Sequence, residues 1–163
     1  MIIKFYDLKK KINKNTNFYL FYGQNAGLID ETINNTIIPN SSKNVNYYEE
    51  NEVINNGDVF KEEILNRSLF EDSKLIIISR VTDKILPIIE EIIEKNINDV
   101  KILLRTVVLD KKSKLRNFFE KNSKTIIVPF YEDNNQTLSI LAQNFFRERN
   151  INISPENINL IIN

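Results

Sequence analysis

The sequence contains no cysteine and no histidine. Without cysteine it can form no disulfide and offers no thiolate to a metal ion. Without histidine it lacks the imidazole on which Ser-His-Asp triads, imidazole general bases and ordinary zinc sites depend. No motif places a pair of carboxylates for acid-base chemistry either. We therefore expect no catalytic residue, no metal site and no cofactor.

The chain also lacks an excess of either charge and a long apolar run. Its 22 Lys and Arg residues balance 22 Asp and Glu residues, so no overall field attracts it to nucleic acid or to an anionic membrane. No stretch approaches the ~18 apolar residues of a membrane span. Lys4 and Asp7 interrupt the N-terminal region where a signal peptide would be apolar. We expect a folded cytoplasmic protein without membrane contact.

Short β-rich runs alternate with helical patterns along most of the chain. The expected strands are residues 18–22, 44–48, 75–79, 100–104 and 125–128. Between them, apolar residues recur at helical spacing, as Ile85, Ile89 and Ile92 do. This alternation predicts an α/β domain with a five-stranded, mostly parallel sheet. The polar second run, 44–48, suits a peripheral strand, whereas the continuous apolar run at 75–79 suits the centre of the sheet.

Aspartates precede several expected helices at positions where their side chains can cap the first turn. Asp7 is expected to cap a short basic helix over residues 8–13. Asp58 is expected to cap a helix with Phe60 on its buried face, and Asp110 a helix whose buried face includes Leu115.

The strand pattern ends before a change near residues 129–135. Beyond it, one helical stripe holds Leu138, Leu141, Phe145 and Phe146. Ser154 and Pro155 then suit the N-cap and first position of another helix. We expect one domain over residues 1–135 and the beginning of a small helical domain over 136–163. Because the last helix ends on exposed isoleucines that need a partner, we also expect the chain to be a fragment of a longer protein.

The turn after the first expected strand contains Gly23 and Gly27, followed by Leu28 and Ile29. A phosphate-binding loop has the pattern G-x-x-x-x-G-K-[ST] in this place. Here the glycines are one residue too close, and neither Leu28 nor Ile29 can contact phosphate or hold magnesium. We expect a degenerate loop that binds no nucleotide. Two alternatives stay open: an ordinary strand-turn-helix junction, and a divergent P-loop NTPase that binds nucleotide between Gly23 and Ile29.

Four blocks of sequence follow the Tyr22-Gly23 pair in a familiar order. They are NRSLFEDSKLII at residues 66–77, LDKKSKLRNFFEK at 109–121, PFYED at 129–133 and ISPE at 153–156. In this order and at this spacing, they resemble the delta subunit of the bacterial DNA polymerase III clamp loader. The resemblance spans nearly the whole chain and about the N-terminal half of the family's usual length.

The resemblance implies an AAA+/P-loop-like, three-layer domain that does not hydrolyse ATP, at residues 1–135, and the start of a lid domain at 136–163. It implies that the protein binds the ring-shaped beta sliding clamp and holds one interface of the ring open, within the DNA polymerase III holoenzyme. ATP would bind to other subunits. The gamma/tau and delta prime subunits would be partners through a C-terminal domain beyond this chain, and DNA contact would be indirect or weak.

In the family, a Leu-Phe pair in a protruding turn inserts into a pocket on the clamp. Leu69 and Phe70 occupy the matching position here, and Ser68 matches the residue before them. The resemblance therefore implies that Ser68, Leu69 and Phe70 bind the clamp. The physical alternative stays open that Phe70 covers the core above the strand at 75–79.

One further group of charged residues has two interpretations. Lys111, Lys112, Lys114 and Arg116 form a basic cluster that either contacts phosphate or is the solvated face of a helix.

The ends of the central strands are equally informative. A working ATPase carries a magnesium-binding acid after the strand at 75–79, but Arg80 stands there, and Asp83 suits a helix cap. Arg80 and Arg105 also argue against a response-regulator-like module, because that module needs an acidic cluster at these strand ends.

Overall fold

The computed structural model describes residues 2–12, 16–41, 44–65, 74–95 and 99–162. The chain divides into two compact units, Met1–Phe130 and Tyr131–Asn163, which are considered separately. The units divide after Phe130, and the first helix of the second unit is α7 (Asn135–Glu148). The expected domains, residues 1–135 and 136–163, stay a prediction. In the described part of the chain, no helix combines the length and the apolar character needed to cross a membrane.

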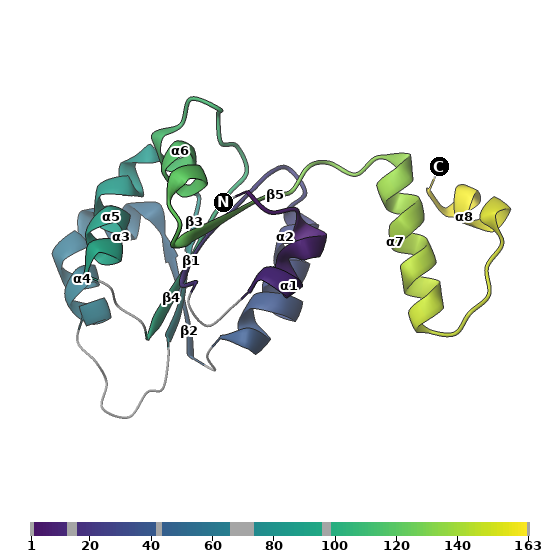
Figure 1. The fold of residues 1–163 in the computed structure, drawn as a ribbon, viewed down its shortest axis with the longest axis horizontal. Coiled ribbons are helices and arrows are strands. Elements are labelled where there is room, and N and C mark those ends of the chain that lie inside the picture. Colours follow the sequence, from purple (N-terminus) through teal and green to yellow (C-terminus); the bar gives the residue numbers. More distant parts are fainter. Residues whose placement is uncertain (1, 13–15, 42–43, 66–73, 96–98, 163) are drawn as a thin grey trace. The chain divides into compact units, whose positions relative to one another are not determined.

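A single parallel sheet forms the centre of the first unit (Figure 1). Its strands are β1 (Phe18–Tyr22), β2 (Asn44–Glu49), β3 (Lys74–Ser79), β4 (Val100–Thr106) and β5 (Thr125–Pro129). The strand order is β2-β3-β4-β1-β5, and every pairing is parallel. All five expected strands are present, and the polar β2 lies at an edge as its composition indicated.

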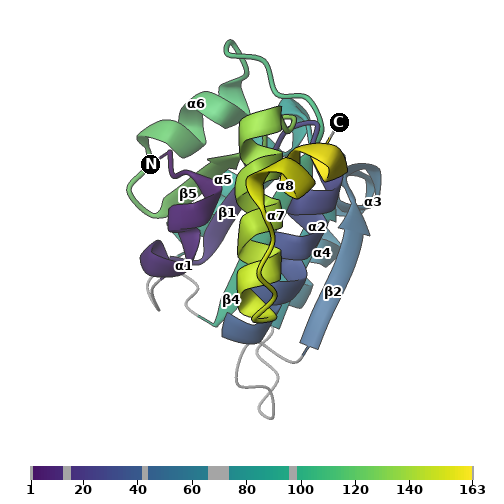
Figure 2. The same cartoon turned by 90° about the vertical axis from the view of Figure 1, so that its right-hand side faces the viewer.

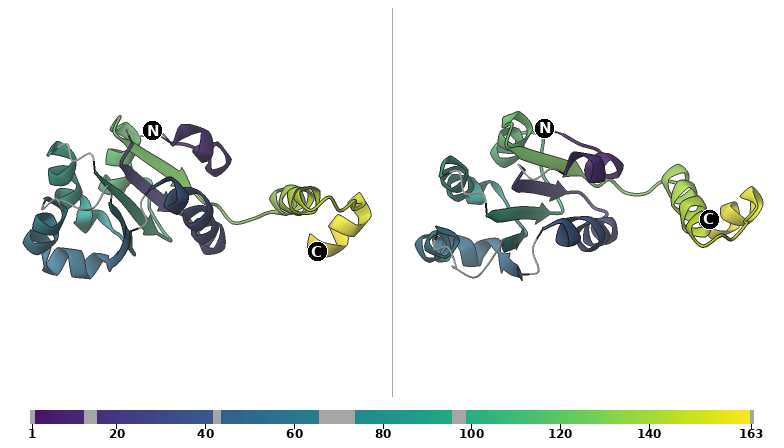
Figure 3. Two further views of the ribbon diagram at one scale, coloured as in Figure 1. Left: turned by 90° about the horizontal axis from the view of Figure 1, so that it is seen from below. Right: turned by 60° about the horizontal axis from the view of Figure 1, so that its bottom comes forward.

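Helices cover both faces of this sheet, as the two views in Figure 3 show. One face carries α3 (Glu50–Asn55), α4 (Gly57–Leu65), α5 (Leu86–Glu94) and α6 (Lys114–Lys121). The other carries α1 (Leu8–Lys11) and α2 (Ala26–Thr32), which continues as a π-helical turn, Ile33–Ile37. The predicted α/β fold of three layers is confirmed.

An apolar core lies on each face of the sheet, because successive strand residues point to opposite faces. In β1, Leu20 packs into the core under α3 to α6, and Phe21 into the core under α1 and α2. In β3, the four residues Leu75 to Ile78 are all fully buried. Full burial of each such side chain contributes about 1.5–3 kcal/mol to folding, so β3 contributes to the stability of both cores.

The helix caps differ in part from the sequence expectations. Helix α6 begins after Ser113, whose Oγ accepts a hydrogen bond from the N–H of Arg116 at 3.1 Å. Asp110 instead accepts one from the N–H of Lys112 at 3.1 Å, in the turn before the helix. Asp7 makes no side-chain cap bond to α1. The expected Asp110 and Asp7 caps are therefore wrong, because the chain turns once more before α6 and enters α1 through a 3-10 turn.

The second unit consists of α7 and α8 (Pro155–Ile162), which pack against each other. Figure 2 shows the two helices with the segment that joins them. Ser154 caps α8 as expected, since its Oγ accepts a hydrogen bond from the N–H of Asn157 at 3.3 Å. Large apolar side chains on this unit remain exposed, among them Leu141 at 52% and Phe145 at 47%.

Candidate functional site

A cleft of about 310 Å³ lies at the carboxyl ends of the strands in the first unit. This edge is where open parallel α/β sheets usually bind ligands. The lining residues come from the ends of four strands and the start of α2: Gly23, Ala26, Ile29, Glu49, Ser79, Arg80, Arg105, Thr106 and Val107. The cleft therefore contains the degenerate loop and is the natural place to look for nucleotide chemistry.

The protein's own backbone occupies the turn at Gly23. This residue has φ +142°, and a Cβ added to it would lie 1.8 Å from the carbonyl oxygen of Phe130. Its N–H donates to the carbonyl of Thr106 at 3.2 Å, and the N–H of Asn25 donates to the carbonyl of Phe130 at 3.4 Å. A phosphate loop offers such N–H groups to a ligand. Here the close approach of Phe130, after β5, explains the glycine, and the N–H groups of Gly23 and Asn25 are bonded to the backbone of β4 and of Phe130.

Helix α2 begins with a cap from its own chain. The side-chain oxygen of Asn25 accepts a hydrogen bond from the N–H of Leu28 at 3.1 Å. Ile29 is only 3% exposed and belongs to the core under α1 and α2, and Leu28 packs against that core. The two positions that carry lysine and a hydroxyl residue in a phosphate loop are thus packing residues.

Two ion pairs neutralise the arginines of the cleft. Arg80 Nε lies 2.7 Å from Glu49 Oε2, and Arg105 Nη1 lies 2.5 Å from Asp30 Oδ1. Arg80 also has a positive φ of 57°, which is uncommon for a residue with a side chain. The described residues include no group of three or more acidic side chains that could hold a metal ion. The strand end that carries a magnesium ligand in an ATPase carries a paired arginine here.

Asp83 stabilises the start of α6. Its carboxylate accepts hydrogen bonds from Ser113 Oγ at 2.5 Å and from the N–H groups of Lys114 and Leu115, both at 3.0 Å. Partial burial by itself raises the pKa of Asp83, but these hydrogen bonds outweigh it and hold the pKa below its usual value. Asp83 is thus a cap, as expected, but for α6. Its own 3-10 turn, Asp83–Ile85, is capped by Thr82.

The basic cluster separates into two parts. Arg116 pairs with Glu120 at 2.7 Å, and its guanidinium lies over the ring of Tyr22 at 5.1 Å from the centroid. Lys111, Lys112 and Lys114 have exposed side chains at the start of α6. Arg116 therefore belongs to the packing of the first unit, and only the three lysines face solvent.

Ser68, Leu69 and Phe70 lie outside the described residues, so their predicted contact with the clamp stays a prediction. The residues on either side are described: α4 ends at Leu65, and β3 begins at Lys74.

A polar cluster near the end of α4 was not expected from the sequence. It consists of Glu63 with Asn46, Tyr48 and Lys74 around its carboxylate. No sequence motif indicates this cluster, because its members come from β2, α4 and β3.

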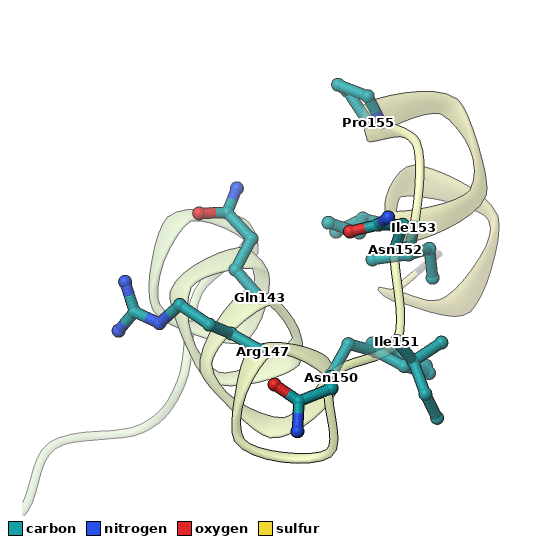
Figure 4. A pocket seen from close by; sticks show the side chains of 9 residues that line it. Gln143, Arg147, Asn150, Ile151, Asn152, Ile153 and Pro155 are labelled. Carbon is teal, nitrogen blue, oxygen red and sulfur yellow. The ribbon is translucent and has the colours of Figure 1, made fainter.

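The second unit has a hollow of about 500 Å³ between α7 and the segment that leads into α8 (Figure 4). Gln143, Arg147 and Asn150 line it from α7 and the turn that follows, opposite Ile153 and Pro155. These groups provide hydrogen-bond donors and apolar contacts but no pair of acid and base.

Comparisons with known proteins show which solved structures share this fold. No family model matches the sequence, and no curated protein matches it. Among solved structures, the chain is similar to the DNA clamp loader delta protein of Bacillus subtilis, with a TM-score of 0.69 and 18% identity over 94% of this chain and 49% of that one. The chain therefore shares its fold with about half of that protein. The replication initiator DnaA bound to AMPPCP and single-stranded DNA is also similar, with a TM-score of 0.52 and 16% identity.

The second match covers 97% of this chain and 53% of the DnaA chain, so the protein spans about half the length of each of these structures. The resemblance to clamp-loader delta that the four sequence blocks indicated thus extends to the fold. At such low identities the similarity establishes the fold alone.

Proposed function

We propose that this chain is the clamp-binding part of a delta-type, non-catalytic subunit of a bacterial clamp loader. It would bind the beta sliding clamp and hold one interface of the ring open while the ring is loaded onto DNA during replication. One observation supports the proposal: in an AAA+-like fold, the backbone of Phe130 packs against Gly23 in the turn after β1, and the N–H groups of Gly23 and Asn25 are bonded within the protein instead of being offered to phosphate.

The contact that we propose consists of Ser68, Leu69 and Phe70, carried between α4 and β3. Burial of two large apolar side chains in a pocket contributes about 1.5–3 kcal/mol each, before the ordering costs of association. A small apolar anchor of this kind is how binding hot spots work. The gamma/tau and delta prime subunits would assemble through a further domain, DNA contact would be indirect or weak, and the complex would act in the cytoplasm.

The experiment measures the affinity of the protein for the purified sliding clamp by surface plasmon resonance. The double variant Leu69→Ala with Phe70→Ala is expected to weaken binding at least about 100-fold, because roughly 3 kcal/mol of burial is lost. Its melting temperature is expected to stay close to that of the unaltered protein.

A matched control is available elsewhere in the first unit. Val107 and Val108 are another adjacent apolar pair, 56% and 73% exposed, and their replacement by alanine is expected to leave clamp affinity unchanged. Unchanged binding by the Leu69 and Phe70 variant would overturn the proposed contact. A large drop in its melting temperature would show that the pair belongs to the core.

A further inference from the structure

The two edge strands of the sheet differ in how their outer sides are covered. Along the outer side of β5, Ile2 forms a parallel bridge with Ile127, and the N–H of Ile3 donates to the carbonyl of Ile127 at 2.9 Å. The other edge strand is β2 (Figure 2). In the described part of the chain, no strand pairs with its outer side. Such an edge presents backbone N–H and C=O groups to another extended chain, here along residues 45–48.

Beside this edge lies a hollow of about 370 Å³, which we call the edge hollow. Its lining includes Tyr47 and Tyr48 from β2, Glu52 from α3, and Val59, Phe60 and Glu63 from α4. Neighbouring residues of a strand point to opposite faces of its sheet. A hollow that reaches both Tyr47 and Tyr48 therefore lies along the outer edge of β2, where the side chains of an added strand would be.

The sequence of β2 does not protect this edge. Exposed edge strands commonly carry lysine or proline, which discourage pairing with another chain. The strand sequence NVNYYE contains neither residue. Its valine and two tyrosines favour an extended backbone, and Tyr47 is 64% exposed. Nothing in β2 itself therefore opposes the addition of a strand.

The surroundings of the edge hollow are acidic, although the whole chain has no net charge. Residues 50–65, which include α3 and α4, contain five acids and one lysine, a net charge of −4. Of the two acids that line the hollow, Glu63 pairs with Lys74. Glu52 accepts a hydrogen bond from the N–H of Glu49 at 2.7 Å and forms no ion pair with a described residue. This surface attracts a basic partner and repels a second copy of itself.

We propose that the outer edge of β2 and the edge hollow bind an extended, basic segment of a partner protein by strand addition. The backbone of the segment pairs with residues 45–48, and one of its apolar side chains enters the hollow against Val59 and Phe60. A neighbouring lysine or arginine lies close to Glu52. Backbone pairing supplies affinity in this mode of recognition, and the hollow supplies specificity. The inference goes beyond the proposed function, because no residue of the proposed clamp contact belongs to this surface.

The test titrates the protein with a peptide of alternating valine and lysine, labelled with fluorescein at its N-terminus and amidated at its C-terminus. Fluorescence anisotropy is expected to show saturable binding. Replacing the lysines by glutamate is expected to weaken binding at least about tenfold, because the surface is acidic. Replacing the central valine by proline is expected to do the same, because proline has no N–H to pair with a strand. Absence of binding by the first peptide, or equal binding of all three, would overturn the proposal.

A matched pair of protein variants locates the contact. Tyr47→Lys introduces a positive charge at the edge of β2, and Tyr131→Lys makes the same change at a residue that is 72% exposed outside the first unit. Tyr47→Lys is expected to raise the Kd of the valine-lysine peptide about tenfold, and Tyr131→Lys to leave it unchanged. Equal weakening by both variants would indicate a general effect of charge and would refute a site at β2.

Two further measurements identify the mode of binding and the occupant. Hydrogen exchange is expected to slow at the amides of β2 when the peptide is added, and to stay unchanged in β5; protection that omits β2 would contradict strand addition. Analytical ultracentrifugation is expected to show a monomer. A dimer that Tyr47→Lys dissociates would instead show that the edge pairs with a second copy of the chain, and the basic partner would be wrong.

Discussion

Replacement of Gly23 by alanine tests whether the turn after β1 is closed by the protein itself. The new Cβ would lie 1.8 Å from the carbonyl oxygen of Phe130 and 2.5 Å from its carbonyl carbon. Both distances are far below contact distance and involve backbone, so no side-chain rotation can relieve them. The φ of +142° is also unfavourable for any residue with a Cβ.

The expected cost follows from the parts of the structure that must move. An unfavourable φ costs on the order of 1–3 kcal/mol. Separating the turn from Phe130 also weakens the two backbone hydrogen bonds that join them, from Asn25 to Phe130 and from Phe130 to Tyr22, each contributing about 0.5–1.5 kcal/mol. Together these effects amount to about 2–6 kcal/mol, which lowers the melting temperature by roughly 5–20 °C.

The assay is urea and thermal unfolding of Gly23→Ala beside Gly27→Ala. Gly27 lies in the first turn of α2, and an added Cβ there would meet only the side chain of Asn25 at 4.0 Å. Because alanine is a better helix former, Gly27→Ala is expected to stabilise the protein by about 0.5 kcal/mol. A Gly23→Ala protein whose melting temperature stays within about 2 °C of the unaltered one would refute the proposed closure of the turn.

Two further predictions concern nucleotide binding and pH. Calorimetric titration with ATP and magnesium is expected to give no saturable binding, because Leu28 and Ile29 are packing residues; micromolar affinity would favour the divergent P-loop NTPase instead. Asp83→Asn is expected to destabilise the protein by about 1 kcal/mol at neutral pH, because the start of α6 loses a negative charge. The pKa of Asp83 is lowered by folding, so its stabilisation is complete above the unfolded-state pKa of about 4 and disappears as pH falls through the lower folded-state pKa. Urea unfolding at neutral and strongly acidic pH is therefore expected to show the difference between the two proteins shrinking in acid; a difference that persists or grows would contradict this role for Asp83.

Features that depend only on residues close together in the sequence, such as strand burial and helix capping, could be predicted. The uninterrupted apolar run in β3 required burial on both faces, and the structure places it inside the sheet, between β2 and β4. The polar composition of β2 required an edge. Ser154 and Pro155 marked the start of α8 because a cap and its helix are adjacent in the chain. In each case the information is local, since strand burial and helix capping are read within a few residues.

The sequence also predicted that the loop after β1 is degenerate, but not why Gly23 is needed there. The reason is Phe130, which is distant in sequence and approaches Gly23 only because β5 lies beside β1. Asp83 likewise caps a helix that begins about thirty residues later, and the pattern around Asp110 indicated a cap that the chain does not use. No spacing rule reports such contacts.

The amino-acid sequence by itself therefore determined the order and type of the elements, the α/β class with its parallel sheet and the absence of lysine and a hydroxyl residue at positions 28 and 29, because each depends on local pattern and residue chemistry. Only the tertiary structure decided which backbone fills the turn at Gly23, which acid pairs with each cleft arginine, and how Glu63, Tyr48 and Lys74 come together. Those contacts join segments far apart in the chain, and they form only once the parallel strands have taken their places in the sheet.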